Sequence, residues 1–186
     1  MTTCRDLGTS ALRMIGVYGG NETPTAADAQ IALDQLQSML TGWVHSGMFG
    51  HLNDYHAATD YTAKEFDRVV ADTTVVVTLP VTVLGSDGVY RKPRDLTVIE
   101  ISDDSGRNTW IWDRDAWVSL SGLAFADDCP IAWRSPRGFA ACLGVNLSGD
   151  FNMPLTPALT RLASQFRTMI SMKLGSTQDP TPVSYF

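Results

Sequence analysis

The sequence predicts an α+β fold, with helices in both end regions of the chain and short strands between them. In two N-terminal and two C-terminal segments, apolar residues recur at alternating steps of three and four, the spacing of one helix face. From about residue 73 to residue 120, β-branched runs and turn dipeptides follow one another. We therefore expect a four-helix core (two N-terminal and two C-terminal helices), an inserted small antiparallel β subdomain and an extended C-terminal tail.

Residues 1–60 are predicted to form a helical hairpin. Thr3 is placed to cap the first helix, and Asp6 is placed as the acidic member of a capping box. The Thr23-Pro24 pair has the composition of an N-cap and a first helical residue, so we expect a second helix from there to about His45. Because only a short loop containing glycine and proline joins the two helices, we expect them to be antiparallel.

Residues 61–130 are predicted to hold a linker helix and the β subdomain. Thr62 and Glu65 form a second capping-box pattern, and Thr73–Leu79 has the β-branched composition of a strand. The Asp87-Gly88 pair is typical of a tight hairpin turn. Further strands are expected at residues 81–84, 89–90, 96–101, 109–112 and 117–120. Short strands separated by turns indicate an antiparallel meander or barrel.

Residues 131–175 are predicted to complete the core with a helical pair. Ser135-Pro136 and Thr156-Pro157 each repeat the cap-plus-proline pattern, and Gly175 is a candidate C-cap. The segment 176–186 has no helical period, so we expect it to be the extended tail. The stripes of the second and last helices predict four side chains that are buried against one another, which are Leu36, Leu40, Leu162 and Phe166.

The composition excludes some classes of protein and leaves others open. The net charge of −6 repels phosphate backbones, which argues against a conventional nucleic-acid binder but not against a wall past which DNA slides. No apolar run approaches the ~18 residues that a membrane-spanning helix needs, so no membrane contact is expected. The three cysteines, Cys4, Cys129 and Cys142, lack CxxC spacing and fit a reducing compartment as small buried side chains.

A search for catalytic patterns finds none, and we predict no enzyme activity, metal or cofactor. His51 and His56 flank Asp54, which raises the alternative of a metal hydrolase. However, their five-residue spacing matches neither a helical i, i+4 zinc pair nor alternate residues of one strand. We therefore interpret them as polar loop residues.

Two aromatic groups are candidate protein contacts. Two tryptophans share one face of a predicted strand, and two prolines precede two aromatic residues in the tail, where rigid rings suit docking on a neighbour. The six candidate interface residues are Trp110, Trp112, Pro180, Pro182, Tyr185 and Phe186. The alternative for the tryptophans is that they fill the core of the sheet. A different class of function is a small-ligand or carbohydrate-binding module that uses the Trp-bearing β insertion.

Both helical regions resemble one known family. Residues Ala11–Val17, followed by Asp28–Leu40 and Trp43, resemble the N-terminal hairpin of head–tail adaptor (connector) proteins of short-tailed bacteriophages and phage-like gene transfer agents. Ala141–Leu147, followed by Pro154–Pro157 and a long helix, resembles the C-terminal half of that family. Together the two parts cover about half of the chain.

The resemblance implies a non-enzymatic virion structural protein at the head–tail interface, assembled in the host cytoplasm. It implies a closed ring of this chain, commonly a dodecamer, beneath the portal protein. It also implies a stopper or tail-completion protein as a further partner, and genomic DNA that passes through the ring without sequence recognition. The block from about Thr73 to Leu120 departs from compact members of the family, so the role of that insert is not implied.

Overall fold

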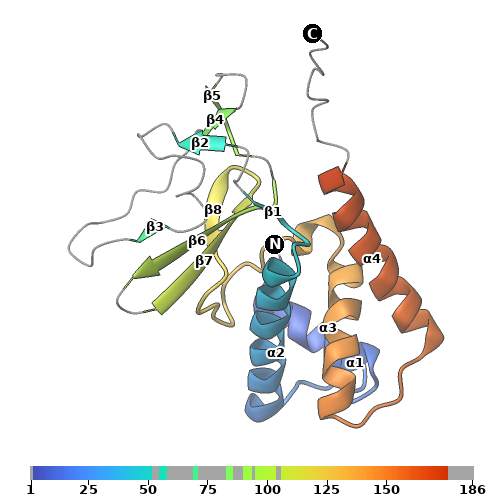
Figure 1. Cartoon of the computed structure of the whole chain (residues 1–186). Coiled ribbons are helices and arrows are strands. Elements are labelled where there is room, and N and C mark those ends of the chain that lie inside the picture. Colours follow the sequence, from blue (N-terminus) through green and yellow to red (C-terminus); the bar gives the residue numbers. More distant parts are fainter. Residues whose placement is uncertain are drawn as a thin grey trace.

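The computed structural model describes residues 2–51, 55–57, 69–70, 83–85, 90–93, 95–103 and 106–175. The chain is an α+β protein with the helices on one side and the sheets on the other (Figure 1). The helix expected near Thr62, the strand expected at Thr73–Leu79, the Asp87-Gly88 turn and the tail at 176–186 lie outside the described residues.

Four α-helices form where the apolar periodicity predicted them: α1 (Cys4–Met14), α2 (Ala26–His45), α3 (Pro136–Asp150) and α4 (Pro157–Gly175). The capping box of Thr3 and Asp6 at the start of α1 is confirmed, with both of its hydrogen bonds present. Ser135 caps α3, and the Thr156 hydroxyl accepts from the Leu159 amide at 3.2 Å. The N-cap of α2 is Thr25 rather than the predicted Thr23, because the Thr25 hydroxyl accepts from the amide of Asp28.

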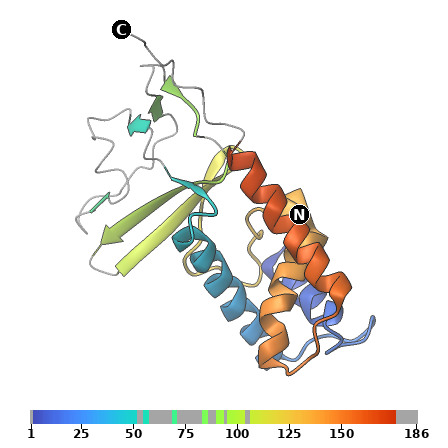
Figure 2. The same cartoon turned by 45° about the vertical axis from the view of Figure 1, so that its right-hand side comes forward.

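Helix α3 is the centre of the helical unit, since α1, α2 and α4 all pack against it. Helices α2 and α4 flank it, as Figures 1 and 2 show. Two glycines permit close approach: a Cβ at Gly138 would lie 3.0 Å from Phe166 of α4, and one at Gly144 would lie 3.2 Å from the Ile15 side chain at the end of α1. Small residues on α3 therefore set the distance at which its neighbours pack.

An aromatic cluster joins α2, α3 and α4. The Phe139 ring stacks on Phe166 at a centroid distance of 5.6 Å and lies 5.5 Å from the Trp43 ring. Nearby, Leu36 and Leu40 are fully buried, while Leu162 is half-buried. The predicted burial is therefore confirmed for Leu36, Leu40 and Phe166 and is only partial for Leu162.

The larger sheet contains the predicted antiparallel meander of β6 (Thr97–Asp103), β7 (Gly106–Asp113) and β8 (Ala116–Ser119). Two short strands, β1 (Gly50–His51) and β3 (Val69–Val70), pair with β6 in parallel, which the sequence did not predict. A second, antiparallel sheet consists of β2 (Tyr55–Ala57), β4 (Val83–Gly85) and β5 (Tyr90–Arg91). Strands β1 and β2 thus fall within the range that was assigned to the helical hairpin.

One face of the larger sheet belongs to the core of the helices. Val98 and Ile111 are paired across β6 and β7, and both are buried in the same cluster as Leu12, Leu40 and Phe139. Alternate residues of a strand point to opposite faces, so Ile99 and Trp112 lie on the other face, where they are also buried. The β region therefore shares its core with the helices.

We predict that Leu36→Ala lowers the free energy of unfolding by about 2–5 kcal/mol, because it leaves a cavity at a fully buried position. Leu162→Ala should cost less, because Leu162 is half-buried and its site is open to solvent. Urea unfolding of the two variants measures the difference. Equal stability of the wild type and Leu36→Ala would contradict the packing described.

We predict opposite effects of alanine at two helix glycines. Gly138→Ala should lower stability by about 1–3 kcal/mol, because the new methyl group meets Phe166 and the Ser135 hydroxyl. Gly42→Ala is the matched control: its Cβ would meet nothing within 4 Å, so the higher helix propensity of alanine should raise stability by up to ~1 kcal/mol. Thermal unfolding of both variants tests this. Two shifts in the same direction would contradict the role given to Gly138.

Candidate functional site between the sheet and the helices

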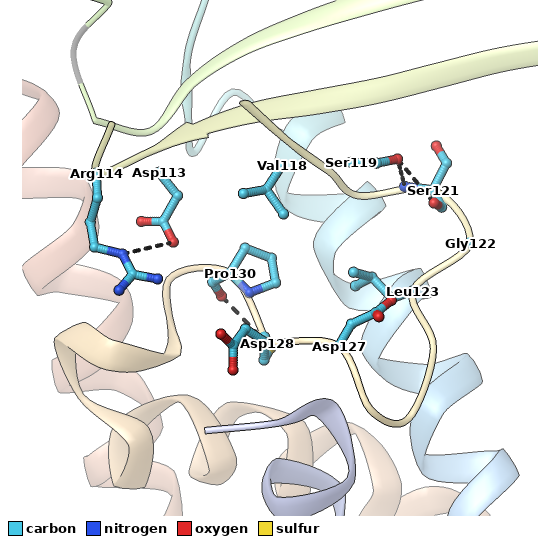
Figure 3. A pocket seen from close by; sticks show the side chains of 11 residues that line it. Asp113, Arg114, Val118, Ser119, Ser121, Gly122, Leu123, Asp127, Asp128 and Pro130 are labelled. Carbon is cyan, nitrogen blue, oxygen red and sulfur yellow. Dashed lines mark hydrogen bonds and ion pairs between the residues drawn. The ribbon is translucent and has the colours of Figure 1, made fainter. Parts of the chain in front are cut away.

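A hollow of about 370 Å³ lies beside the turn from β7 to β8 and the loop that leads to α3 (Figure 3). Its polar lining comes from Asp113, Arg114, Ser119, Ser121, Asp127 and Asp128. Carboxylates, hydroxyls and a guanidinium in one concavity make it a candidate site for chemistry.

Asp113, at the end of β7, is the most buried of the carboxylates in this hollow, with 4% of its surface exposed. It accepts hydrogen bonds from the Trp133 indole Nε1 at 2.7 Å and from the Ile131 amide at 3.3 Å. Arg114 Nε lies 3.9 Å from the same carboxylate. Ile131 has φ of 70°, a conformation that costs a β-branched residue energy, so the hydrogen bond that its amide donates to Asp113 helps to hold a strained turn.

Trp133, in the 3-10 helix η2 (Ala132–Arg134), has two arginines close to its ring and is 44% exposed. The guanidinium carbons of Arg134 and Arg114 are 4.6 Å and 5.7 Å from its ring centroid, within the range of cation–π attraction. Arg134 also pairs with Asp95, just before β6, at 2.6 Å, and Asp95 accepts from the Arg114 amide. These contacts connect the sheet to the segment that enters α3.

A second carboxylate of the hollow, that of Asp127, also binds the backbone. Asp127 accepts from the Ala124 amide at 2.7 Å and thereby closes a loop turn. The main chain of this loop clamps the start of α1: the Cys4 amide donates to the Asp127 carbonyl, and the Cys129 amide donates to the Thr2 carbonyl. These hydrogen bonds and ion pairs around the hollow therefore connect segments that are distant in sequence: β7, the segment before β6, the loop that leads to α3, and the start of α1. We call this set of polar contacts the joint.

Two of the cysteines, Cys129 and Cys142, are poor candidates for a nucleophile. A hydrogen bond to Cys4, together with burial, raises the pKa of the Cys129 thiol well above its usual value. Burial raises the pKa of Cys142 to about 11. Both thiols therefore stay protonated near neutral pH, and a protonated thiol is a poor nucleophile.

The residues considered for a metal site belong to two different sheets and lie in part outside the described residues. His51 lies in β1 and His56 in β2, strands of two different sheets, and Asp54 lies outside the described residues. Within the described ranges, no group of three or more His, Cys, Asp or Glu side chains could hold a metal ion. Among the helices that the structure describes, none combines the length and apolar character that a membrane crossing requires.

The structure separates the predicted interface residues into three groups. Trp112 is only 1% exposed and packs edge-to-face on Trp117 at 5.2 Å, so the core interpretation applies to it and its assignment to an interface is withdrawn. Trp110 is half-buried and stays a candidate. Pro180, Pro182, Tyr185 and Phe186 lie outside the described residues.

Sequence reasoning missed Trp133 and its arginines. Trp133 precedes the cap at Ser135 and belongs to no periodic stripe, so no local pattern marks it. Its partner Asp113 is 20 positions away, and the partner of Arg134, Asp95, is 39 positions away. Only the tertiary fold brings these groups together.

The fold and this joint define an α+β protein in which a mixed sheet and a helical unit share one core. No protein-family model matches the sequence, and no curated protein matches it either.

We predict that Asp113→Ala lowers the free energy of unfolding by about 1–3 kcal/mol, since it leaves the Ile131 amide buried without an acceptor. The matched control is Asp115→Ala, two residues after Asp113 in the sequence. It removes only an exposed ion pair with Lys92 and should cost no more than about 1 kcal/mol. Denaturant unfolding followed by tryptophan fluorescence measures both. Equal losses would mean that Asp113 does not hold the joint.

Proposed function

We propose that this chain is a structural head–tail adaptor subunit of a tailed bacteriophage or a gene transfer agent. It would form a ring beneath the portal protein and join the capsid to the tail through a stopper or tail-completion protein. The observation that carries the proposal is the packing of α1 and α2 with α3 and α4 in one core. These are the two segments that resemble adaptor proteins, and the entire β region separates them in sequence.

The chemistry of the hollow also supports a structural role. Its buried carboxylate, Asp113, holds a strained turn and an indole, and its buried thiol, Cys129, is protonated, so neither of these two groups is available to act on a substrate. The net charge of −6 suits a channel wall, because genomic DNA would slide past it without binding.

The rival proposal, a small-ligand or carbohydrate-binding module that uses the Trp-bearing β insertion, loses one of its aromatic residues. A ring that stacks on a sugar or other small ligand must be accessible, and Trp112 is buried. The other two tryptophans of the insertion, Trp110 and Trp117, are half-buried, and the Trp117 ring packs edge-to-face on Trp112, so the adaptor is the better supported function.

We predict that the free protein is a monomer and assembles into a ring on its cognate portal. Light scattering with and without the purified portal protein measures the mass of each species. Truncation after Gly175 should leave the fold intact, since α4 is complete, and should sharply reduce portal binding if Tyr185 and Phe186 are anchors.

The outcomes of this experiment separate the proposals. Failure of the full chain to bind the portal would overturn the adaptor function. Full binding by the truncated chain would remove only the role of the tail. A ligand-binding module predicts a monomer under all of these conditions.

A further inference from the structure

The outer faces of α2 and α4 carry few charges for solvent-exposed helices. The exposed residues of α2 are Ala26, Ala27, Gln30, Ile31, Asp34, Ser38, Thr41, Gly42 and His45. Those of α4, over residues 157–171, are Pro157, Ala158, Thr160, Arg161, Ser164, Gln165, Thr168 and Ser171. Asp34 and Arg161 are the permanent charges on the two faces. Charge depletion distinguishes the centre of a protein interface from ordinary surface.

Two features of the α2 face are not explained by the chain itself. Ile31 is 38% exposed and is one of the few large apolar side chains on the described surface. Gly42 lies within the helix, where glycine is unfavourable, yet a Cβ there would meet nothing within 4 Å. Close approach by another molecule would account for both features. It would cover the Ile31 side chain, and the absence of a side chain at Gly42 would let that molecule approach the helix backbone.

The charges of the two faces are complementary. Asp34 makes the α2 face acidic, and Arg161 makes the α4 face basic. A contact of two α2 faces centred on Asp34, or of two α4 faces centred on Arg161, would bring like charges together, whereas contact of α2 with α4 at these residues pairs opposite charges. Helices α2 and α4 flank α3, so one molecule can use both faces at once (Figures 1 and 2).

We propose that the exposed face of α2 packs against the exposed face of α4 of a second copy of this chain, with Asp34 opposite Arg161. This contact is heterologous, and repetition of it generates a ring if the rotation closes. The inference deepens the proposed function, on which its ring depends, by assigning the lateral contact between neighbouring subunits.

The first test uses charge reversal in the full chain with its portal. Asp34→Arg and Arg161→Asp should each reduce the number of subunits bound per portal and weaken assembly roughly tenfold or more, because each creates a like-charge pair at every lateral contact. The double variant should restore assembly. The matched controls are Asp150→Arg and Arg137→Asp, which make the same changes at exposed positions of α3 and should assemble as the wild type.

The second test needs no portal. Ser38→Cys and Ser164→Cys place single exposed thiols on the α2 and α4 faces, while the native cysteines are buried. In concentrated solution a short bismaleimide captures transient encounters between monomers that light scattering does not detect. A mixture of the two variants should therefore give crosslinked dimers, and each variant alone should give few. Crosslinks within one variant alone would indicate an isologous contact and would overturn the inference.

The two tests distinguish this inference from the adaptor function. Crosslinking of the mixture without portal binding would support the lateral contact and remove the adaptor. Portal binding with neither crosslinking nor compensation by the double variant would leave the adaptor and overturn the lateral contact.

Discussion

The close approach of helices at α3 is the constraint on which the rest of the structure depends. Gly138 allows the backbone of α3 to approach Phe166, and Gly144 gives the Ile15 side chain room beside it. Larger side chains at these positions would push α1 and α4 outward and open the aromatic cluster around Phe139. Because protein interiors are close-packed, such a displacement cannot stay local. The positions of α1 and α4 relative to α3 therefore depend on the two glycines, Gly138 and Gly144.

The sheet is fixed to this helical unit by both apolar and polar contacts. Val98 and Ile111 extend the core onto the sheet, but apolar packing is weakly directional. Direction comes from the Asp113 carboxylate, at the end of β7, and from the pair of Arg134 with Asp95, just before β6. Both connect the same edge of the sheet to the entry of α3. Hydrogen bonds fix the orientation of the two parts because they weaken steeply when the angle at the hydrogen departs from linear.

The sequence predicted what is decided locally. Caps such as Thr3 and Ser135 act within three residues, and helix stripes repeat within two turns, so both are visible in a short window. Interactions between distant segments were not predictable in this way. The parallel pairing of β1 and β3 with β6 depends on strands too short to show a pattern, and the ring of Trp133 meets Asp113 only after the chain has folded. Trp112 shows the same limit, since its strand position predicted its face but not what covers it.

The joint and the lateral contact impose one common requirement, which is a rigid subunit. A heterologous contact closes into a ring only when the angle between the two contact faces is constant, because a small error is repeated at every subunit. The α2 and α4 faces belong to helices whose separation is set by α3, so that angle is determined inside the monomer. The joint contributes no residue to the α2 and α4 faces. It fixes the segment that enters α3, through the hydrogen bond of Trp133 and the ion pair of Arg134. In this view the buried carboxylate and the packed glycine contribute to assembly at a distance, by keeping the geometry of the subunit fixed before it meets a neighbour.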